Sequence, residues 1–179
     1  MELRDASHWA YGTRMLGRLY EKQDCSAARA LELVGERWSL LILRDALFRN
    51  FTRFSQFQKS LGLATNILAK RLEGFVAVGL MEHRQPQASG EQAEYQLTQK
   101  GLELKPVIIA LTEWGDKWVQ PGPVVFQHKS DGQPVELQLR GVGDDTQVAI
   151  ADVVVRQRYA VPPRDTDEQT LPNRSRNSH

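Results

Sequence analysis

The sequence predicts a mainly α-helical fold with one β-hairpin, followed by a small β-rich, ribbon-like carboxyl-terminal unit. Three features carry this prediction: two short amphipathic segments joined by a tight break, two strand-like segments around a polar loop, and a later run of alternating apolar residues. The chain has 179 residues, of which 41% are hydrophobic and 25% are charged. That length fits about one domain with an appendage, and the composition is typical of a folded chain.

The amino-terminal part of the domain predicts two helices in close succession. Residues 26–34 form a short amphipathic segment, with Ser26 as the expected N-cap and Gly35 where a C-cap glycine belongs. Residues 37–48 are apolar on nearly every side, which is typical of a buried central helix. We therefore expect Trp38, within this segment, to pack inside the core.

A helix-turn-helix unit follows. Apolar residues recur at intervals of three and four from Phe54 until Gly62, which predicts a short amphipathic helix. After a tight break with the sequence Gly-Leu-Ala-Thr, a longer helix is expected over about residues 64–78. Its core-facing stripe consists of Leu68, Leu72 and Val76. Two helices joined by so short a turn are typical of helix-turn-helix units.

A hairpin and a further helix complete the domain. Two strands are expected over about residues 80–98, around a polar loop that is too long for a minimal turn, a shape known as a wing. A helix then extends over residues 99–119, and Pro106 either kinks or restarts it because proline lacks the N–H that a helix interior needs. This order of elements is that of a winged helix-turn-helix domain.

Beyond residue 120 the pattern changes to short alternating segments. Residues 124–126 and 135–139 alternate as in a hairpin, and residues 148–155 are expected to add a third strand. The composition then turns to proline, arginine, aspartate, serine and asparagine, which predicts a disordered tail. The expected organisation is an amino-terminal dimerisation helix at 1–24, a winged-helix domain at 25–120, a β unit at 121–160 and a tail at 161–179.

Charge and cysteine content narrow the class of protein. The net charge is only +1, yet residues 37–105 hold ten Lys and Arg against six Asp and Glu. This basic block is either a nucleic-acid face or an ordinary solvated surface. The single cysteine excludes an internal disulfide, and the sequence shows neither a membrane-spanning run nor a signal peptide. We expect a cytoplasmic protein.

Several segments resemble a known family in the order in which they occur. Residues 25–45, with Ala-Leu-Glu-Leu-Val-Gly-Glu-Arg-Trp-Ser-Leu-Leu at their centre, resemble the opening of HxlR-type winged-helix regulators. Further matches are residues 53–57, 68–72 followed by 78–80, 95–101 and 111–115. The resemblance spans about residues 20–120 and implies a bacterial, homodimeric transcription regulator that is not an enzyme. The sequence also contains no nucleophile elbow or phosphate loop, and it indicates no cofactor.

The carboxyl-terminal part departs from that family. Many relatives carry a ribbon with a His-x-x-Cys-Gly and a later Cys-x-x-Cys-Gly, whereas residues 128–132 and 139–143 contain no cysteine. A closed zinc site needs four nitrogen or sulfur ligands, so we expect no metal here. Apolar packing is expected to hold the ribbon instead, through Val135, Leu137, Val148, Ile150 and Val153.

The second helix of the predicted helix-turn-helix carries the expected DNA-reading residues. With the apolar stripe turned to the core, Asn66, Lys70 and Glu73 lie on the opposite face. Asn66 has the donor and the acceptor that pair with an adenine edge, and Lys70 suits a phosphate. Arg71 flanks the stripe, so it is either a DNA contact or the partner of Glu36 or Glu73 in an ion pair.

Other candidate DNA contacts lie around this helix. Thr65 is either the N-cap of the helix or a phosphate ligand through its hydroxyl. Ser55 and Gln56, near the start of the preceding helix, are expected to meet the DNA backbone. Arg84, at the base of the wing, either enters the minor groove or is a solvated strand-end residue.

Cys25 is a candidate redox sensor. It directly precedes a helix, whose N-terminus favours a reactive thiolate, and the resemblance adds that some family members sense oxidants through the cysteine at this position. The alternative is a small buried residue at a dimer interface. With one cysteine per chain, sensing requires an intersubunit disulfide or an adduct.

Two apolar stripes exceed the needs of one winged helix and predict a homodimer. They lie at residues 8–20 and 106–118, and a symmetric dimer implies a palindromic operator in double-stranded DNA. Trp114 and Trp118 line either the dimer seam or a cavity for an unidentified small-molecule effector. The leading hypothesis is a sequence-specific DNA-binding transcription regulator, and the alternative is a winged helix that serves as a protein-interaction module.

Overall fold

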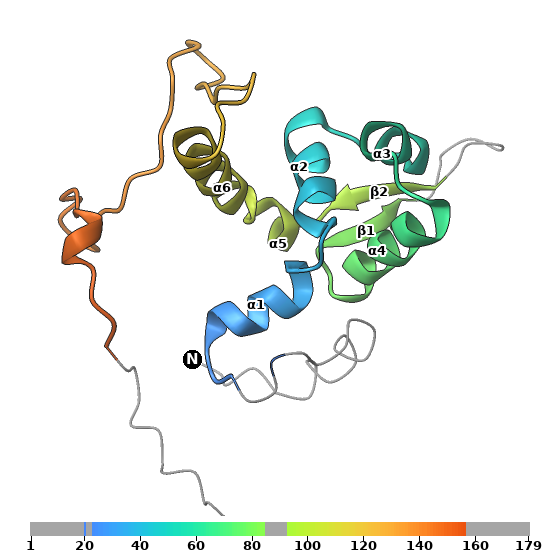
Figure 1. Cartoon of the computed structure of the whole chain (residues 1–179), viewed down its shortest axis with the longest axis horizontal. Helices are drawn as coiled ribbons and strands as arrows, with labels where there is room; N and C mark the ends of the chain where they lie inside the picture. The colour runs from blue at the N-terminus through green and yellow to red at the C-terminus, as the bar shows by residue number, and fades with distance from the viewer. Residues whose placement is uncertain (1–19, 21–22, 85–92, 157–179) are drawn as a thin grey trace, which may run out of the picture. The chain divides into compact units, whose positions relative to one another are not determined.

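The computed structural model describes residues 20, 23–84 and 93–156 (Figure 1). The chain divides into two compact units, residues 1–137 and residues 138–179. Most of the predicted amino-terminal helix, the tip of the wing loop and the predicted carboxyl-terminal tail lie outside the described residues.

Over residues 26–118 the described part of the first unit consists of helices and one hairpin, in the predicted order. They are α1 (Ser26–Val34), α2 (Ser39–Arg49), α3 (Phe54–Leu61), α4 (Thr65–Ala77), β1 (Met81–Arg84), β2 (Glu94–Leu97), α5 (Gln99–Leu102) and α6 (Lys105–Trp118). The antiparallel strands lie beside α3 and α4 (Figure 1). The predicted winged helix-turn-helix fold is therefore confirmed. None of the helices in the described ranges is long and apolar enough to cross a membrane.

The hydrophobic core lies between α2, α3, α4 and the hairpin. Helix α2 is its centre, as predicted for an apolar helix, because Ile42 and Leu43 have no exposed surface. The largest fully buried apolar side chains of this core are Phe57, Phe75, Ile42, Leu43, Leu68, Leu72 and Met81. Trp38 stands at the N-cap of α2 and is only half-buried against the edge of this core, so the expectation that it packs inside is met in part.

Local geometry sets the two ends of α1. The sequence predicted Ser26 as the N-cap, and this prediction is wrong. The N-cap is Cys25, because the last residue with an extended backbone before the helix is Cys25. Its sulfur accepts a hydrogen bond from the Ala28 backbone N–H at 3.3 Å. Gly35 closes the helix as expected. A β-carbon at Gly35 would lie 2.5 Å from the Leu31 carbonyl oxygen, so only glycine fits there.

Proline separates the last two helices of the first unit. Helix α5 ends at Leu102 and α6 begins at Lys105, so Pro106 occupies the second position of a new helix. A proline at this position loses nothing, because the first N–H groups of a helix have no intrahelical partner. Of the two alternatives, Pro106 therefore restarts the helix instead of kinking it.

The segment after α6 does not form the predicted strands. Among the described residues of this segment, one antiparallel bridge joins Gln127 to Pro134 in the first unit, and another joins Arg140 to Gln147 in the second. Residues Ile150–Asp152 form a short 3-10 helix, η2. Four of the residues expected to pack a ribbon are exposed: Val135, Leu137, Ile150 and Val153. The alternation misled the prediction because so short a segment buries too little apolar surface to hold a sheet.

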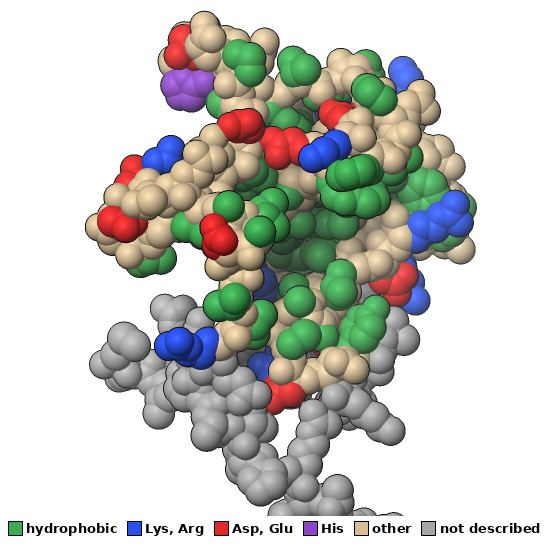
Figure 2. Space-filling view, turned by 60° about the vertical axis from the view of Figure 1, so that its left-hand side comes forward, with side chains coloured by type: hydrophobic (Ala, Val, Ile, Leu, Met, Phe, Trp, Pro, Cys, Tyr) green, Lys and Arg blue, Asp and Glu red, His purple; other side chains and the backbone are tan. Residues whose placement is uncertain are grey.

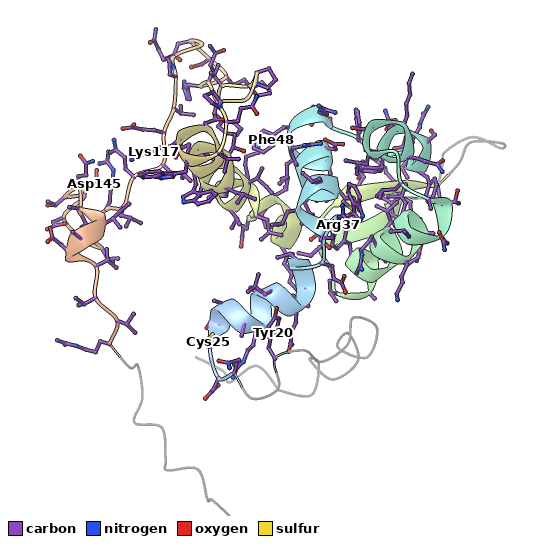
Figure 3. The ribbon with its side chains drawn as sticks, viewed as in Figure 1. Tyr20, Cys25, Arg37, Phe48, Lys117 and Asp145 are labelled. Atoms are coloured by element: carbon purple, nitrogen blue, oxygen red, sulfur yellow. The ribbon has the colours of Figure 1, made fainter. Side chains whose placement is uncertain are left out.

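Residues 121–137 are attached to the helices of the first unit by side-chain contacts. The Phe126 ring lies against that of Phe48 in α2, with ring centroids 5.1 Å apart, and Phe48 is marked in Figure 3. The Leu137 backbone N–H donates a hydrogen bond to the Glu113 carboxylate of α6 at 3.2 Å. This segment therefore depends on α2 and α6, and not on a sheet of its own.

Candidate nucleic-acid interface

The orientation of α4 decides which side chains face outward. Leu68 and Leu72 have no exposed surface and Phe75 is almost completely buried, so one side of the helix is turned into the core. Asn66 and Lys70 are exposed on the opposite side. The structure thus has the helix phase that the apolar spacing predicted.

The first turn of α4 differs from the sequence prediction at Thr65. The residue in the N-cap position is Ala64, and Thr65 is the first helical residue, so the N-cap interpretation of Thr65 is wrong. The Thr65 hydroxyl instead accepts a hydrogen bond from the Gln58 side-chain amide at 2.9 Å, which ties α3 to α4. The Asn66 side-chain oxygen accepts from the Ile67 backbone N–H at 2.9 Å, which leaves the Asn66 amide nitrogen as a donor.

Arg71 lies at the flank of α4 and is mostly enclosed. Its side chain is 13% exposed, and its Nη2 atom lies 2.6 Å from the Glu36 carboxylate. Two further guanidinium nitrogens, Nε and Nη1, are buried without a hydrogen-bond partner among the described residues. Of the alternatives for Arg71, the structure therefore favours the ion pair with Glu36, which joins α4 to the connection between α1 and α2.

Ser55 and Gln56 lie in the first turn of α3, and both are exposed. The Gln56 side-chain oxygen accepts hydrogen bonds from the Thr52 and Arg53 backbone N–H groups at 3.0 Å and 2.9 Å. Gln56 thus caps the helix, a role that the sequence analysis missed although glutamine at the third helical position is a known capping signal. Lys59, one turn after Ser55, is an exposed cation on the same helix that the sequence analysis also passed over.

The hairpin is fastened to α4 through Glu73. The Tyr95 hydroxyl donates to the Glu73 carboxylate at 2.9 Å, and the His83 Nε2 atom lies 3.3 Å from its other oxygen. Burial, followed by the hydrogen bond to Glu73 and the negative charge of that carboxylate, raises the pKa of Tyr95 to about 12. Sequence spacing could not reveal this contact, because it depends on how the hairpin packs on α4. Arg84 is exposed at the end of β1, opposite Glu94.

Cys25 is exposed at the start of α1, as Figure 3 shows. The nearby Arg29 guanidinium is engaged in an ion pair with Asp24. The alternative interpretation, burial of Cys25 at a dimer interface, stays a prediction because the structure describes a single chain. Among the described residues no group of three or more histidine, cysteine, aspartate or glutamate side chains is placed to hold a metal ion.

Helix α6 carries an apolar stripe that is largely exposed. Ile108 is buried, but the exposed fractions of Trp114 and Trp118 are 58% and 66%. Val107 and Leu111 continue the stripe toward the start of the helix and are also exposed. Figure 2, which brings the left-hand side of Figure 1 forward, shows hydrophobic side chains gathered at the surface. Large exposed apolar patches on a folded chain mark interaction sites.

These features define the class of protein. A second helix with a polar outer face, a tight turn before it and a hairpin beside it form a winged helix-turn-helix, the arrangement with which many transcription regulators meet DNA. The model of the HxlR-like helix-turn-helix family matches residues 33–123. The chain belongs to this family, as the sequence resemblance indicated, and it is a transcriptional regulator.

Similar proteins agree with that assignment. An uncharacterized HTH-type transcriptional regulator of Mycobacterium tuberculosis is 39% identical over 117 residues, which cover 64% of this chain and 73% of that protein. The crystal structure of PA1607, assigned as a transcription factor, matches with a TM-score of 0.68 and 41% identity over 76% of this chain and 96% of that chain. PA1374 of Pseudomonas aeruginosa matches with a TM-score of 0.55 and 33% identity, covering 78% and 96% of the two chains.

Proposed function

We propose that this protein is a homodimeric, sequence-specific DNA-binding regulator that places α4 in the major groove and the β1–β2 hairpin beside it as a wing. The observation that carries the proposal is the division of α4 into a buried side and an exposed polar side. A B-DNA major groove admits one α-helix, and a helix so divided can enter it without disturbing the core.

The exposed residues have different roles in this proposal. Asn66 contacts a base edge: its amide nitrogen can donate, and its oxygen has a second lone pair that can accept besides the bond from the Ile67 N–H. Lys70, Thr65 and the first turn of α3, with Ser55 and Gln56, contact phosphates and fix the register of the helix on the duplex. Arg84 reaches the adjacent minor groove. Arg71, held by Glu36, supports α4 and does not contact DNA.

The α6 stripe supports the dimer. Val107, Leu111, Trp114 and Trp118 lie on one side of the helix and are exposed in the single chain. Most soluble oligomers are symmetric dimers, and a two-fold axis would pair the α4 helices with the two halves of a palindromic operator. A Trp114→Glu variant should be a monomer at micromolar concentration, as measured by its mass in solution. The control variant Ala77→Glu, on α4, should stay a dimer like the parent. A parent protein that is itself a monomer contradicts the dimer.

Selection of bound genomic fragments at physiological salt tests DNA recognition. The parent protein should enrich a two-fold symmetric sequence, and Asn66→Ala should lose the enrichment while it keeps weak binding to random DNA. If the parent binds all fragments alike, sequence-specific recognition is wrong. If it binds no DNA, the proposal is wrong and the alternative, a protein-interaction module, is favoured.

A further inference from the structure

We propose that Glu73 is a positioning residue: through Tyr95 and His83 it fixes the hairpin against α4 and so sets where the wing meets DNA. This inference rests on the proposed function, because a wing has a position on DNA only if α4 binds there. It also gives Glu73 a structural role on the recognition helix, where its negative charge would otherwise only repel phosphates.

The contact uses both oxygens of one carboxylate. Tyr95 of β2 donates its hydroxyl to one oxygen at 2.9 Å, and His83 of β1 approaches the other at 3.3 Å. His83 and Tyr95 stand opposite each other in the hairpin, with ring centroids 4.9 Å apart. Glu73 therefore holds one cross-strand pair, with one oxygen for each strand, at the point where the hairpin passes α4.

A second set of contacts holds the same hairpin to the start of α3. The Tyr95 backbone N–H donates to the Thr52 carbonyl at 2.8 Å, and Arg53 lies 3.0 Å from the Glu94 carboxylate. Strand β2 is thus fixed to the helix before the turn through its backbone and to the helix after the turn through the Tyr95 hydroxyl. The hairpin cannot shift along α4 without breaking either the backbone hydrogen bond to Thr52 or the hydroxyl hydrogen bond to Glu73.

The hairpin needs such contacts because it is small. Each strand has four residues and the sheet has two strands, a size that is marginally stable without support from a helix. The carboxylate–hydroxyl bond involves an ionised acceptor, which makes it stronger than a bond between neutral groups. Loss of this bond should change the direction of the wing before it changes the stability of the core.

The variants separate positioning from charge. Glu73→Ala and Glu73→Gln both remove the negative charge, but only glutamine keeps an oxygen that accepts from the Tyr95 hydroxyl. Tyr95→Phe removes the donor and keeps the ring, and Glu82→Ala removes a charge from β1 at an exposed position next to His83. Each variant is compared with the parent by hydroxyl-radical footprinting and by titration on the selected operator, after circular dichroism shows that it is folded.

If Glu73 positions the wing, Glu73→Ala and Tyr95→Phe lose the protection that flanks the central major-groove footprint and bind the operator about threefold to tenfold more weakly. Glu73→Gln and Glu82→Ala keep the flanking protection. If Glu73→Ala and Glu73→Gln instead behave alike and both bind more tightly, Glu73 acts by its charge alone and the inference is overturned. A parent that gives no footprint on any DNA overturns the proposed function, whereas a parent footprint that all variants keep overturns only this inference.

Discussion

The Ser60 hydroxyl of α3 donates a 2.6 Å hydrogen bond to the Asp45 carboxylate of α2, which has no exposed surface. Arg44 donates from Nε to the other oxygen at 2.9 Å, and the Arg49 guanidinium lies 3.6 Å from the same oxygen. A buried carboxylate is tolerated only when cations and hydrogen-bond donors surround it. Asp45 and Ser60 therefore connect the central helix to the first helix of the helix-turn-helix.

Ser60→Ala should lower the free energy of unfolding by about 1–3 kcal/mol, because it removes a hydrogen bond to a buried charge. Urea unfolding measures this change. Ser55→Ala is the matched control, since Ser55 is an exposed serine of the same helix, and its midpoint should stay close to that of the parent. Equal midpoints for Ser60→Ala and Ser55→Ala would show that the Asp45 contact contributes nothing to stability.

The burial of Tyr95 and its contact with Glu73 should make stability depend on alkaline pH. The folded-state pKa of Tyr95 is raised from 10.0 to about 12, so the folded protein holds this proton more tightly than the unfolded chain. The resulting stabilisation is fully present below pH 10 and is lost as the pH rises from 10 toward 12. The free energy of unfolding should therefore fall more steeply over this range in the parent than in Tyr95→Phe. Parallel curves for the two proteins would contradict the raised pKa.

The sequence predicted the elements of the fold better than it predicted their contacts. The spacing of Leu68 and Leu72 sets the phase of α4, because the period of a helix relates neighbouring turns directly. The pair Arg71–Glu36 joins residues 35 positions apart, so no local pattern could select Glu36 over Glu73.

The alternation of apolar residues beyond residue 120 predicted strands wrongly, for a different reason. It predicted strands at 124–126, 135–139 and 148–155, yet the described part of this segment has two isolated bridges and one 3-10 helix. A period of two says which face of a strand is apolar, but a strand also needs a partner and a core to cover that face. Ile150, with 83% of its surface exposed, has no such cover among the described residues of its unit.

Cys25 should make DNA binding sensitive to oxidants if it is a redox sensor. Its sulfur is exposed at the N-cap of α1, where an oxidant can reach it. Diamide would oxidise two Cys25 thiols to an intersubunit disulfide and be reduced to the hydrazine, whereas a quinone would add to a single thiol. Either treatment should release operator DNA from the parent protein and leave Cys25→Ser bound. Release from both proteins to the same extent would leave Cys25 a structural N-cap only.

Lys70 and Asn66 should separate phosphate contacts from base contacts, although both lie on the outer face of α4. Phosphate contacts are blind to sequence, so Lys70→Ala should weaken binding to operator and random DNA alike and reduce the salt slope by about one unit. Asn66→Ala should cost about 1–3 kcal/mol on the operator and leave random DNA and the salt slope nearly unchanged, since its contact is to a base edge. Fluorescence anisotropy titrations at several salt concentrations measure the affinity of each variant for operator and random DNA and its salt slope. An Asn66→Ala protein that binds the operator as tightly as the parent would mean that another residue of α4 reads the base.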